Sequence, residues 1–419
     1  VLLKNVVEVR EKLRQLQAVD PALFASHFDA RLLDVALYRV APNDPPPDGV
    51  VALAKDAEKG KDEEYNADVV QGHDWVVVGV TAGGTYQLLK QKWSKTVFGH
   101  GLCDLLVLDE ASQLSLPAAL MAALPLKPDA PVVVVGDHRQ MPPVVKHDWE
   151  REARRTFQQF EVYTSLFDTL RQHNPPMIQF AESFRLHAAM AAFLRQEVYR
   201  HDGIDYFSKK RDLLHARAVP DEFAAAVLRP DCPLVVVVHD EAGSQVRNPF
   251  EQALIGPVVR VLAAADGYAL DADAGLGVVV PHRAQRAAMR EAFPQLCVLD
   301  AATGLPARSA IDTVERFQGG ERTVILVSAT ESDPAYLLMA GEFLLDPRRL
   351  TVAVSRAKRK MVLVASRSVF ELFSPDEETF ANALLWKNLL LRTCTTLLWE
   401  GDRDGTAVKV WGGGCGTEA

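Results

Sequence analysis

The stretch Leu105-Leu106-Val107-Leu108-Asp109-Glu110-Ala111-Ser112-Gln113 is the most informative part of this sequence for its fold. Its four apolar residues predict a buried strand, and two adjacent carboxylates follow that strand directly. A buried strand that ends in paired acids is typical of sites that bind a nucleoside triphosphate. In such a site Asp109 would hold Mg²⁺ and Glu110 would polarise the attacking water. The usual partner is a GxxxxGK[ST] phosphate loop, which does not occur in this sequence.

Continuous apolar runs of the same kind recur along the chain and predict the fold class. Because each run is apolar at consecutive positions, both faces of each strand should be buried, as in a parallel sheet covered by helices. The runs fall into two groups, so we expect an α/β protein with two parallel sheets in succession. They lie at residues 75–80, 105–108, 131–135, 234–238, 277–280, 323–328 and 360–365.

Changes in hydrophobic period and in composition along the chain predict the domain limits. Residues 1–40 have a helical period, and residues 380–398 form a Leu/Trp-rich stretch that also favours a helix. The closing Gly412-Gly413-Gly414 should fray. The predicted parts are a first domain at 1–150 with an insertion at about 41–72, a linker at 151–176, a second domain at 177–372 and a helical tail at 373–419.

The composition is that of an ordinary globular protein. Of the 419 residues, 48% are hydrophobic and 24% charged, and the formal net charge is -9. An acidic total does not indicate a nucleic-acid binder, although local grooves matter more than the sum. Five scattered cysteines without a CxxC pair argue against zinc ribbons and iron–sulfur clusters and fit a reduced, cytosolic setting. The sequence has no signal peptide and no run long enough to span a bilayer, so we expect no membrane partner.

The ends of the predicted strands carry further candidate residues, because α/β sheets place their chemistry there. Gly136-Asp137-His138-Arg139-Gln140 follows the run at 131–135. A glycine at a strand end lets the backbone turn sharply. Gln140 is a neutral donor and acceptor, which suits it to sensing a γ-phosphate or the attacking water.

Two arginines and a glycine pair in the second half fit the same chemistry. Phosphoryl transfer spreads negative charge over oxygens that a guanidinium matches in geometry and sign. Arg185 opens a predicted helix, and Arg356 precedes the last predicted strand. Gly319 and Gly320 permit close backbone approach, and Glu321 could accept hydrogen bonds from a ribose or an arginine.

Five motifs in fixed order resemble a known family. The chain resembles superfamily 1 helicases of the nonsense-mediated-decay helicase type over about residues 70–370. The motifs are DEASQ at 109–113, GDHRQMPP at 136–143, FRLH at 184–187, VERFQGGE at 314–321 and RRLTVAVSRAK at 348–358.

The resemblance implies a fold and a set of site residues. The fold would be two RecA-like domains in tandem, the first incomplete at its N-terminus, with ATP and Mg²⁺ as cofactors. The catalytic residues would be Glu110, Gln140, Arg185 and Arg356. The nucleotide and its metal would be held by Asp109, Gly136, Asp137, Gly319, Gly320 and Glu321. Nucleic-acid contacts would be Thr81, Gly83, Pro281, His282 and Thr313.

The implied activity is ATP-dependent movement on single-stranded DNA or RNA, with 5′-to-3′ polarity expected from the family. Contacts would be mainly to phosphate and sugar, so base preference should be slight. Nothing in the sequence indicates protein partners. No cluster of acids with a lysine at nuclease spacing stands out.

Three departures from the family pattern qualify the resemblance. Thr351 stands where the family usually has Asn, and Phe184 stands where it has Tyr. The third departure is the absent phosphate loop. Since the chain starts at Val1 inside a helical pattern, we expect a fragment whose parent carries that loop upstream. By itself the chain should hydrolyse ATP poorly. The alternative is a non-catalytic module, derived from a helicase, that binds nucleic acid or protein.

Overall fold

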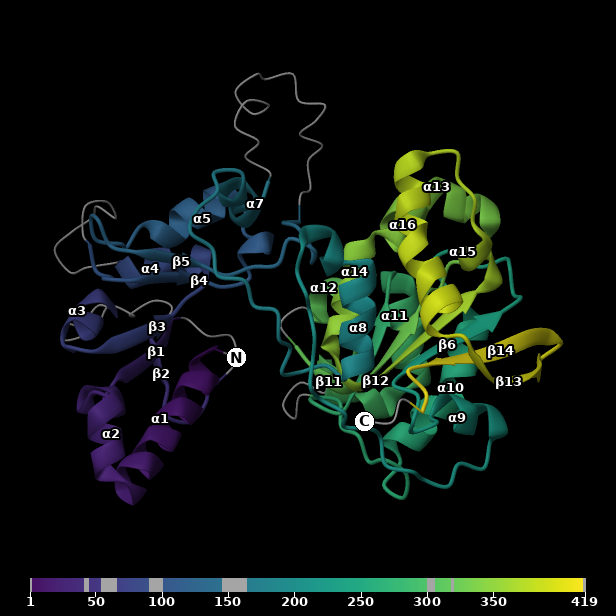
Figure 1. The fold of residues 1–419 in the computed structure, drawn as a ribbon, viewed down its shortest axis with the longest axis horizontal. Coiled ribbons are helices and arrows are strands. Elements are labelled where there is room, and N and C mark those ends of the chain that lie inside the picture. The colour runs from purple at the N-terminus through teal and green to yellow at the C-terminus, as the bar shows by residue number, and fades with distance from the viewer. Residues whose placement is uncertain are drawn as a thin grey trace. The chain divides into compact units, whose positions relative to one another are not determined.

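The computed structural model divides the chain into two compact units. The first comprises Val1–His138 and Pro142–Pro175, and the second comprises Arg139–Met141 and Pro176–Ala419. Each unit is described by itself (Figure 1). The residues that the structure describes are 2–40, 45–53, 66–89, 101–144, 164–299, 306–317 and 320–416.

The second unit is built on a seven-stranded sheet. Its first five strands in spatial order are mutually parallel, and the last two add an antiparallel hairpin at one edge. In spatial order the strands are β10 (Ile311–Thr313), β7 (Leu276–Val280), β11 (Arg322–Ser328), β12 (Ala357–Ser366), β6 (Leu234–His239), β14 (Thr406–Gly413) and β13 (Thr396–Arg403).

Both faces of this sheet are buried, as its continuous apolar runs predict. Successive residues of β6 point alternately into two cores, with Val236 in one and Val237 in the other. Helices cover each face: α8 (Ala188–Glu197), α13 (Pro334–Leu345), α14 (Pro347–Arg356) and α16 (Glu377–Asn388) contribute to the first core, and α9 (Glu222–Val227), α10 (Pro249–Ala263) and α11 (Arg283–Ala292) to the second. The predicted α/β class with parallel sheets is therefore confirmed.

The first unit contains two smaller parallel sheets. Strands β2 (Val51–Leu53), β1 (Ala36–Val40) and β3 (Val76–Gly79) form one of them, in that order. Strands β4 (Leu106–Leu108) and β5 (Val132–Val134) form the other. The helices of this unit are α1 (Leu2–Val19), α2 (Pro21–His27), α3 (Asn66–Gln71), α4 (Thr85–Leu89), α5 (Leu116–Ala123) and α7 (Leu166–Arg171).

Three predictions for the first unit were wrong in part. The helical reading of residues 1–40 missed β1, whose run of Ala-Leu-Tyr-Arg-Val is too short for its period to separate strand from helix. The predicted insertion at 41–72 contains β2, which pairs with β1 and so belongs to the sheet. Burial on both faces also fails here, because Val107 of β4 and Val132 of β5 are 45% and 46% exposed.

The predicted helical tail is helical only in its first half. After α16 a short π-helical turn spans Leu389–Thr393, and the chain then forms the β13–β14 hairpin. The prediction that Gly412 and Gly413 fray was also wrong, since they pair with Val235 and Leu234. A Cβ on Gly413 would lie 2.6 Å from the backbone oxygen of Thr393, so this approach requires glycine.

A buried lysine and a disulfide fix the segment that precedes β6. Lys360 of β12 is 1% exposed and donates to the backbone oxygens of Arg229, at 2.9 Å, and Cys232, at 2.5 Å. Burial lowers the pKa of Lys360 to about 7. Cys232 is bonded to Cys415 beyond β14, so the expectation of reduced cysteines throughout was wrong for this pair. Within the described residues, no helix is long and apolar enough to cross a membrane.

We expect the disulfide to stabilise the second unit. It joins residues 183 positions apart, and a long closed loop removes much entropy from the unfolded chain. Cys415→Ser should therefore lower the free energy of unfolding by about 2–4 kcal/mol. Thermal melting measured with and without dithiothreitol checks this. The reductant should lower the melting temperature of the wild type and leave that of the variant unchanged, and a wild type indifferent to reductant would contradict the bond.

Candidate nucleotide and nucleic-acid sites

The paired acids of the first unit lie at the end of β4, as the sequence predicts. Asp109 Oδ1 accepts a hydrogen bond of 2.9 Å from the backbone N–H of Glu110. Glu110 has a φ of 52°, in the left-handed region that non-glycine residues rarely adopt. Gln113 Nε2 donates to Glu110 Oε2 at 3.2 Å. Such strained backbone is often found at functional sites, where surrounding contacts hold it.

The neighbouring strand brings Gly136 beside these acids. The ladder between β4 and β5 continues past their ends, because Val135 N–H donates to the Leu108 oxygen and Ala111 N–H to the Val135 oxygen, both at 2.8 Å. A Cβ on Gly136 would lie 2.8 Å from the Phe167 ring. The glycine is thus required by close packing of α7, and the predicted sharp turn is not what demands it. Asp137 follows it in the same strand-end segment.

Thr81 and Gly83 lie after β3 in a short 3-10 turn, Ala82–Gly84. The Thr81 hydroxyl accepts a hydrogen bond of 3.1 Å from Gly84 N–H and so caps this turn. Gly83 is exposed, and among the described residues a Cβ placed on it would meet nothing within 4 Å. The Gly83 backbone is therefore open to a ligand, whereas the Thr81 hydroxyl already has a structural role.

In the second unit Arg356 brings distant parts of the sequence together. Its side chain is almost fully buried, at 2% exposure. Nη2 donates to Gln140 Oε1 at 2.9 Å, and Nη1 reaches the Gly320 oxygen at 3.4 Å. Nε donates to Ser355 Oγ at 3.1 Å. Thus a glutamine 216 positions away in sequence meets the predicted arginine finger.

Arg185 and Glu321 complete this cluster. Arg185 Nε donates to Glu321 Oε2 at 2.9 Å, and Lys358 Nζ lies 2.5 Å from Glu321 Oε1. Burial raises the pKa of Glu321, but Lys358 and then Arg185 outweigh it, and the pKa falls below its usual value. One carboxylate thus faces two cations directly, with Arg356 nearby through Gly320. The cluster has a positive balance suited to phosphate.

Lys358 was not among the predicted site residues, although it stands at the end of the RRLTVAVSRAK motif. Its signal was the position two residues after Arg356, at the start of β12. Gly319, which the sequence also predicts here, lies outside the described residues. Thr351, at the position where the family has Asn, is 1% exposed, and its hydroxyl has no hydrogen-bond partner within the described part of the chain.

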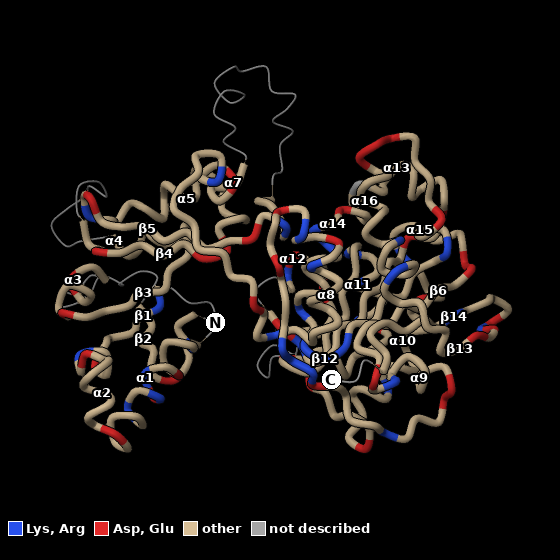
Figure 2. The backbone as a smooth tube through the Cα atoms, viewed as in Figure 1, with Lys and Arg blue, Asp and Glu red and all other residues tan. Residues whose placement is uncertain are grey.

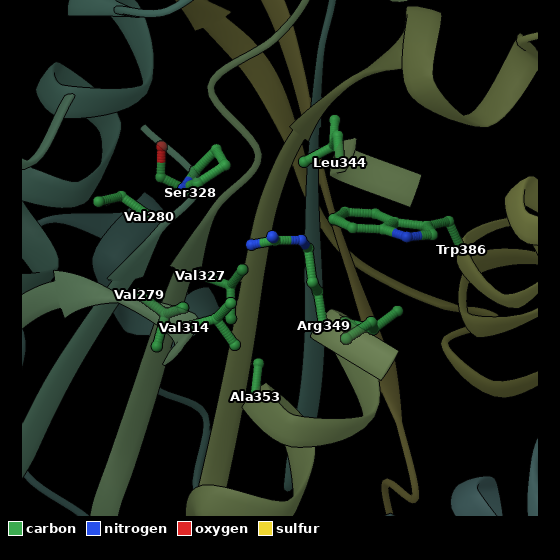
Figure 3. A pocket seen from close by; sticks show the side chains of 11 residues that line it. Val279, Val280, Val314, Val327, Ser328, Leu344, Arg349, Ala353 and Trp386 are labelled. Carbon is green, nitrogen blue, oxygen red and sulfur yellow. The ribbon is translucent and has the colours of Figure 1, made fainter. Parts of the chain in front are cut away.

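The predicted nucleic-acid residues of the second unit lie at one edge of the sheet. Thr313 ends β10 and pairs in register with Val280, which ends the parallel strand β7 and precedes Pro281. His282 follows, and its Nε2 lies 2.6 Å from Glu331 Oε1. A cavity of about 30 Å³ opens beside Pro281, between the strand ends and helices α14 and α16 (Figure 3).

Three arginines that the sequence analysis did not single out surround the carboxylate next to Thr313. Asp312 accepts from Arg286 at 2.8 Å and Arg290 at 3.0 Å, both on α11. Arg316, 69% exposed in its side chain, lies 3.8 Å away. Arg286 and Arg290 belong to α11 and Arg316 to α12 (Val314–Phe317), and Figure 2 shows Lys and Arg in blue along the backbone. Three cations around one anion leave a local excess of positive charge, despite the acidic total.

The sequence is similar to those of several known proteins. A family model described as an AAA domain matches residues 162–368. The DNA replication ATP-dependent helicase/nuclease DNA2 of Mus musculus is 29% identical over 302 residues, which cover 67% of this chain and 26% of that protein. Its Saccharomyces cerevisiae counterpart is 25% identical over 315 residues, covering 71% and 19%. The chain is therefore similar to an AAA domain and to ATP-dependent helicase/nucleases.

The chain spans about a fifth to a quarter of the length of these curated relatives. A solved structure described as a complex of Arterivirus nonstructural protein 10 (helicase) with DNA matches at 12% identity with a TM-score of 0.31. That match covers 86% of this chain and 51% of the viral chain.

The buried and the half-exposed arginine should differ in their effect on stability. Arg356→Met removes a guanidinium from acceptors that are then left buried, so it should lower the free energy of unfolding by about 1–3 kcal/mol. Arg185 is 37% exposed in its side chain, and Arg185→Met should cost less than about 1 kcal/mol. Urea denaturation of both variants checks this. Equal losses would contradict the burial argument.

Proposed function

We propose that this chain is part of an ATP-dependent helicase or translocase of superfamily 1 that moves on single-stranded nucleic acid, with 5′-to-3′ polarity. The observation that supports this best is the cluster of Gln140, Arg185, Glu321 and Arg356, which four separate motifs contribute. Phosphoryl transfer needs little from a protein beyond positioning and charge stabilisation, and this cluster has the groups for both. ATP would be hydrolysed between two RecA-like units, so that domain movement accompanies turnover.

The residues of the first unit would supply the metal and the base. Mg²⁺ commonly takes one or two protein carboxylates and completes its shell with phosphate and water. Asp109, exposed at the end of β4, meets that requirement. The described residues include no cluster of three or more metal-binding side chains, and such a magnesium site needs none. The ion would neutralise charge on the phosphates, while Glu110 would orient and deprotonate the attacking water.

Single-stranded nucleic acid would cross the strand ends that carry Thr313, Pro281 and His282, and the first unit would contribute Gly83 and Thr81. The arginines around Asp312 would hold the backbone phosphates. The names of the relatives, DNA replication helicase/nucleases, favour DNA as the substrate. Among helicases, membership of the nonsense-mediated-decay type stays a prediction.

The assignment of Glu110 as the base predicts a specific kinetic defect. In a preparation with measurable turnover, either this chain or a longer protein that contains it, Glu110→Gln should lower kcat by about 100-fold or more. Nucleotide affinity should remain, because the amide keeps the shape of the side chain. ATPase assays and nucleotide titration measure the two effects. Asp104→Asn, an exposed acid before β4, is the control and should change neither.

Comparable turnover in Glu110→Gln would show that another group is the base. Nucleic-acid binding without any ATP hydrolysis, in this chain and in a longer protein, would overturn the motor. It would favour instead the non-catalytic module derived from a helicase.

The basic edge predicts a change in salt dependence. If Arg316 neutralises one phosphate, Arg316→Ala should weaken binding of labelled oligothymidine and reduce the slope of log K against log salt by about 0.7. Arg229→Ala is a matched control: that side chain is 49% exposed and is likewise paired with an acid, but it precedes β6 at the opposite strand ends. A slope that changes equally in both variants would argue against this edge as the binding surface.

A further inference from the structure

An aromatic ring on α13 connects the predicted nucleic-acid contact to the helix of Arg356. Phe343 stacks with His282 at a centroid distance of 5.6 Å and an interplanar angle of 22°. The guanidinium carbon of Arg349 lies 3.6 Å from the centroid of the same Phe343 ring. Phe343 therefore contacts both the residue after Pro281 and a residue of α14.

Carboxylates fix both ends of this stack. Glu331 Oε1 lies 2.6 Å from His282 Nε2, and Glu331 is fully buried. Glu315 Oε1 lies 2.5 Å from Arg349 Nη1. Glu315 belongs to α12 (Val314–Phe317), which begins directly after Thr313. The stack thus joins both segments of the second unit that the sequence predicts to touch nucleic acid.

Helix α14 carries this connection to the nucleotide cluster. Arg349 and Arg356 are seven residues apart on it, which is close to two full turns, so they leave the same side about 10 Å apart. Arg349 donates a hydrogen bond to Glu315 near the start of α12. Arg356 donates to the backbone oxygen of Gly320, which follows α12 in the sequence. A movement of α12 or of His282 would therefore reach Arg356 through one short rigid helix.

The cavity beside α14 leaves space for such a movement. Arg349 points into it, and Leu350 and Trp386 line it with the ends of β7 and β11 (Figure 3). Among the described residues the Trp386 indole N–H has no hydrogen-bond partner, although the residue is only 2% exposed. Close-packed interiors resist displacement, whereas a wall with unfilled space can shift without a clash.

We propose that Phe343 and Arg349 are positioning residues that couple nucleic-acid contact at His282 and Thr313 to the placement of Arg356. Neither residue contacts nucleotide in this role. Arg349 acts through its ion pair with Glu315 and its contact with the Phe343 ring. The inference rests on the proposed function, because it requires nucleic acid to bind at this edge.

Hydrogen exchange on the 419-residue chain tests the coupling without requiring ATP turnover. Labelled oligothymidine is titrated to obtain the Kd, and amide exchange is followed across Pro347–Arg356 with and without saturating oligomer. In the wild type, binding should slow exchange of this helix by about fivefold or more. Phe343→Leu keeps an apolar side chain and loses the aromatic face, so it should bind with a similar Kd and lose the slowing.

Two further variants separate positioning from folding. Phe343→Tyr keeps the ring and should retain the slowing, as a conservative rescue. Arg349→Lys keeps the charge opposite Glu315 but loses the planar contact with the ring, and should lose the slowing. Phe343 is 41% exposed, so its substitution should leave the circular dichroism spectrum unchanged.

The outcomes distinguish a failure of the proposed coupling from a failure of the proposed function. If the wild type does not bind the oligomer, the proposed nucleic-acid edge fails, and the coupling fails with it. If it binds but exchange in α14 does not change, or if Phe343→Leu behaves as the wild type, the coupling alone is wrong. A Phe343→Leu variant that folds but no longer binds would make Phe343 part of the binding surface and overturn its role as a positioning residue.

Discussion

Burial of both faces of the parallel sheet is the constraint on which the second unit depends. Val236 and Val237 illustrate it, since neighbouring residues of one strand enter two separate cores. A polar group without a hydrogen-bond partner is costly within such a strand, so polar side chains are favoured where the strands end. Because β10, β7, β11, β12 and β6 are parallel, their carboxyl ends meet at one edge. The register of Thr313 with Val280 then sets how close the two predicted nucleic-acid segments lie.

The cluster of Gln140, Arg185, Glu321 and Arg356 shows how charge is oriented without being cancelled. Gln140 and the Gly320 oxygen are neutral acceptors, which hold the Arg356 guanidinium in place and leave its charge intact. Arg185 instead shares the Glu321 carboxylate with Lys358. A carboxylate between two cations stays ionised, in agreement with its lowered pKa, and still leaves one positive charge in excess. This arrangement suits a bound anion, because positive charge remains in excess at the cluster.

Sequence reasoning succeeded where a residue's role follows from local pattern. The apolar runs of β6, β7, β11 and β12 have one physical solution, which is burial on both faces. It failed where pattern is ambiguous or partners are distant. The run Thr396-Leu397-Leu398-Trp399 fits helix or strand equally well, and only its pairing with β14 decides. No local sequence pattern predicts the disulfide between Cys232 and Cys415. Nor does a local pattern show that Lys360, which lies beside two other basic residues, is buried.

The candidate site shows the same difference between residues that a local pattern identifies and residues that only three-dimensional contacts identify. Gln140, Arg185 and Arg356 could be selected from motifs, because each stands within a recognisable motif. The partners of those residues could not, since Lys358, Phe343 and Arg349 matter only through three-dimensional contact. Helix α14 makes the difference plain: its motif singles out Arg356, yet Arg349 at its other end contacts α12 and α13. A helix this short bends little, so whatever fixes Arg349 also fixes Arg356. Placement of the predicted finger therefore depends on residues that its own motif does not identify as partners.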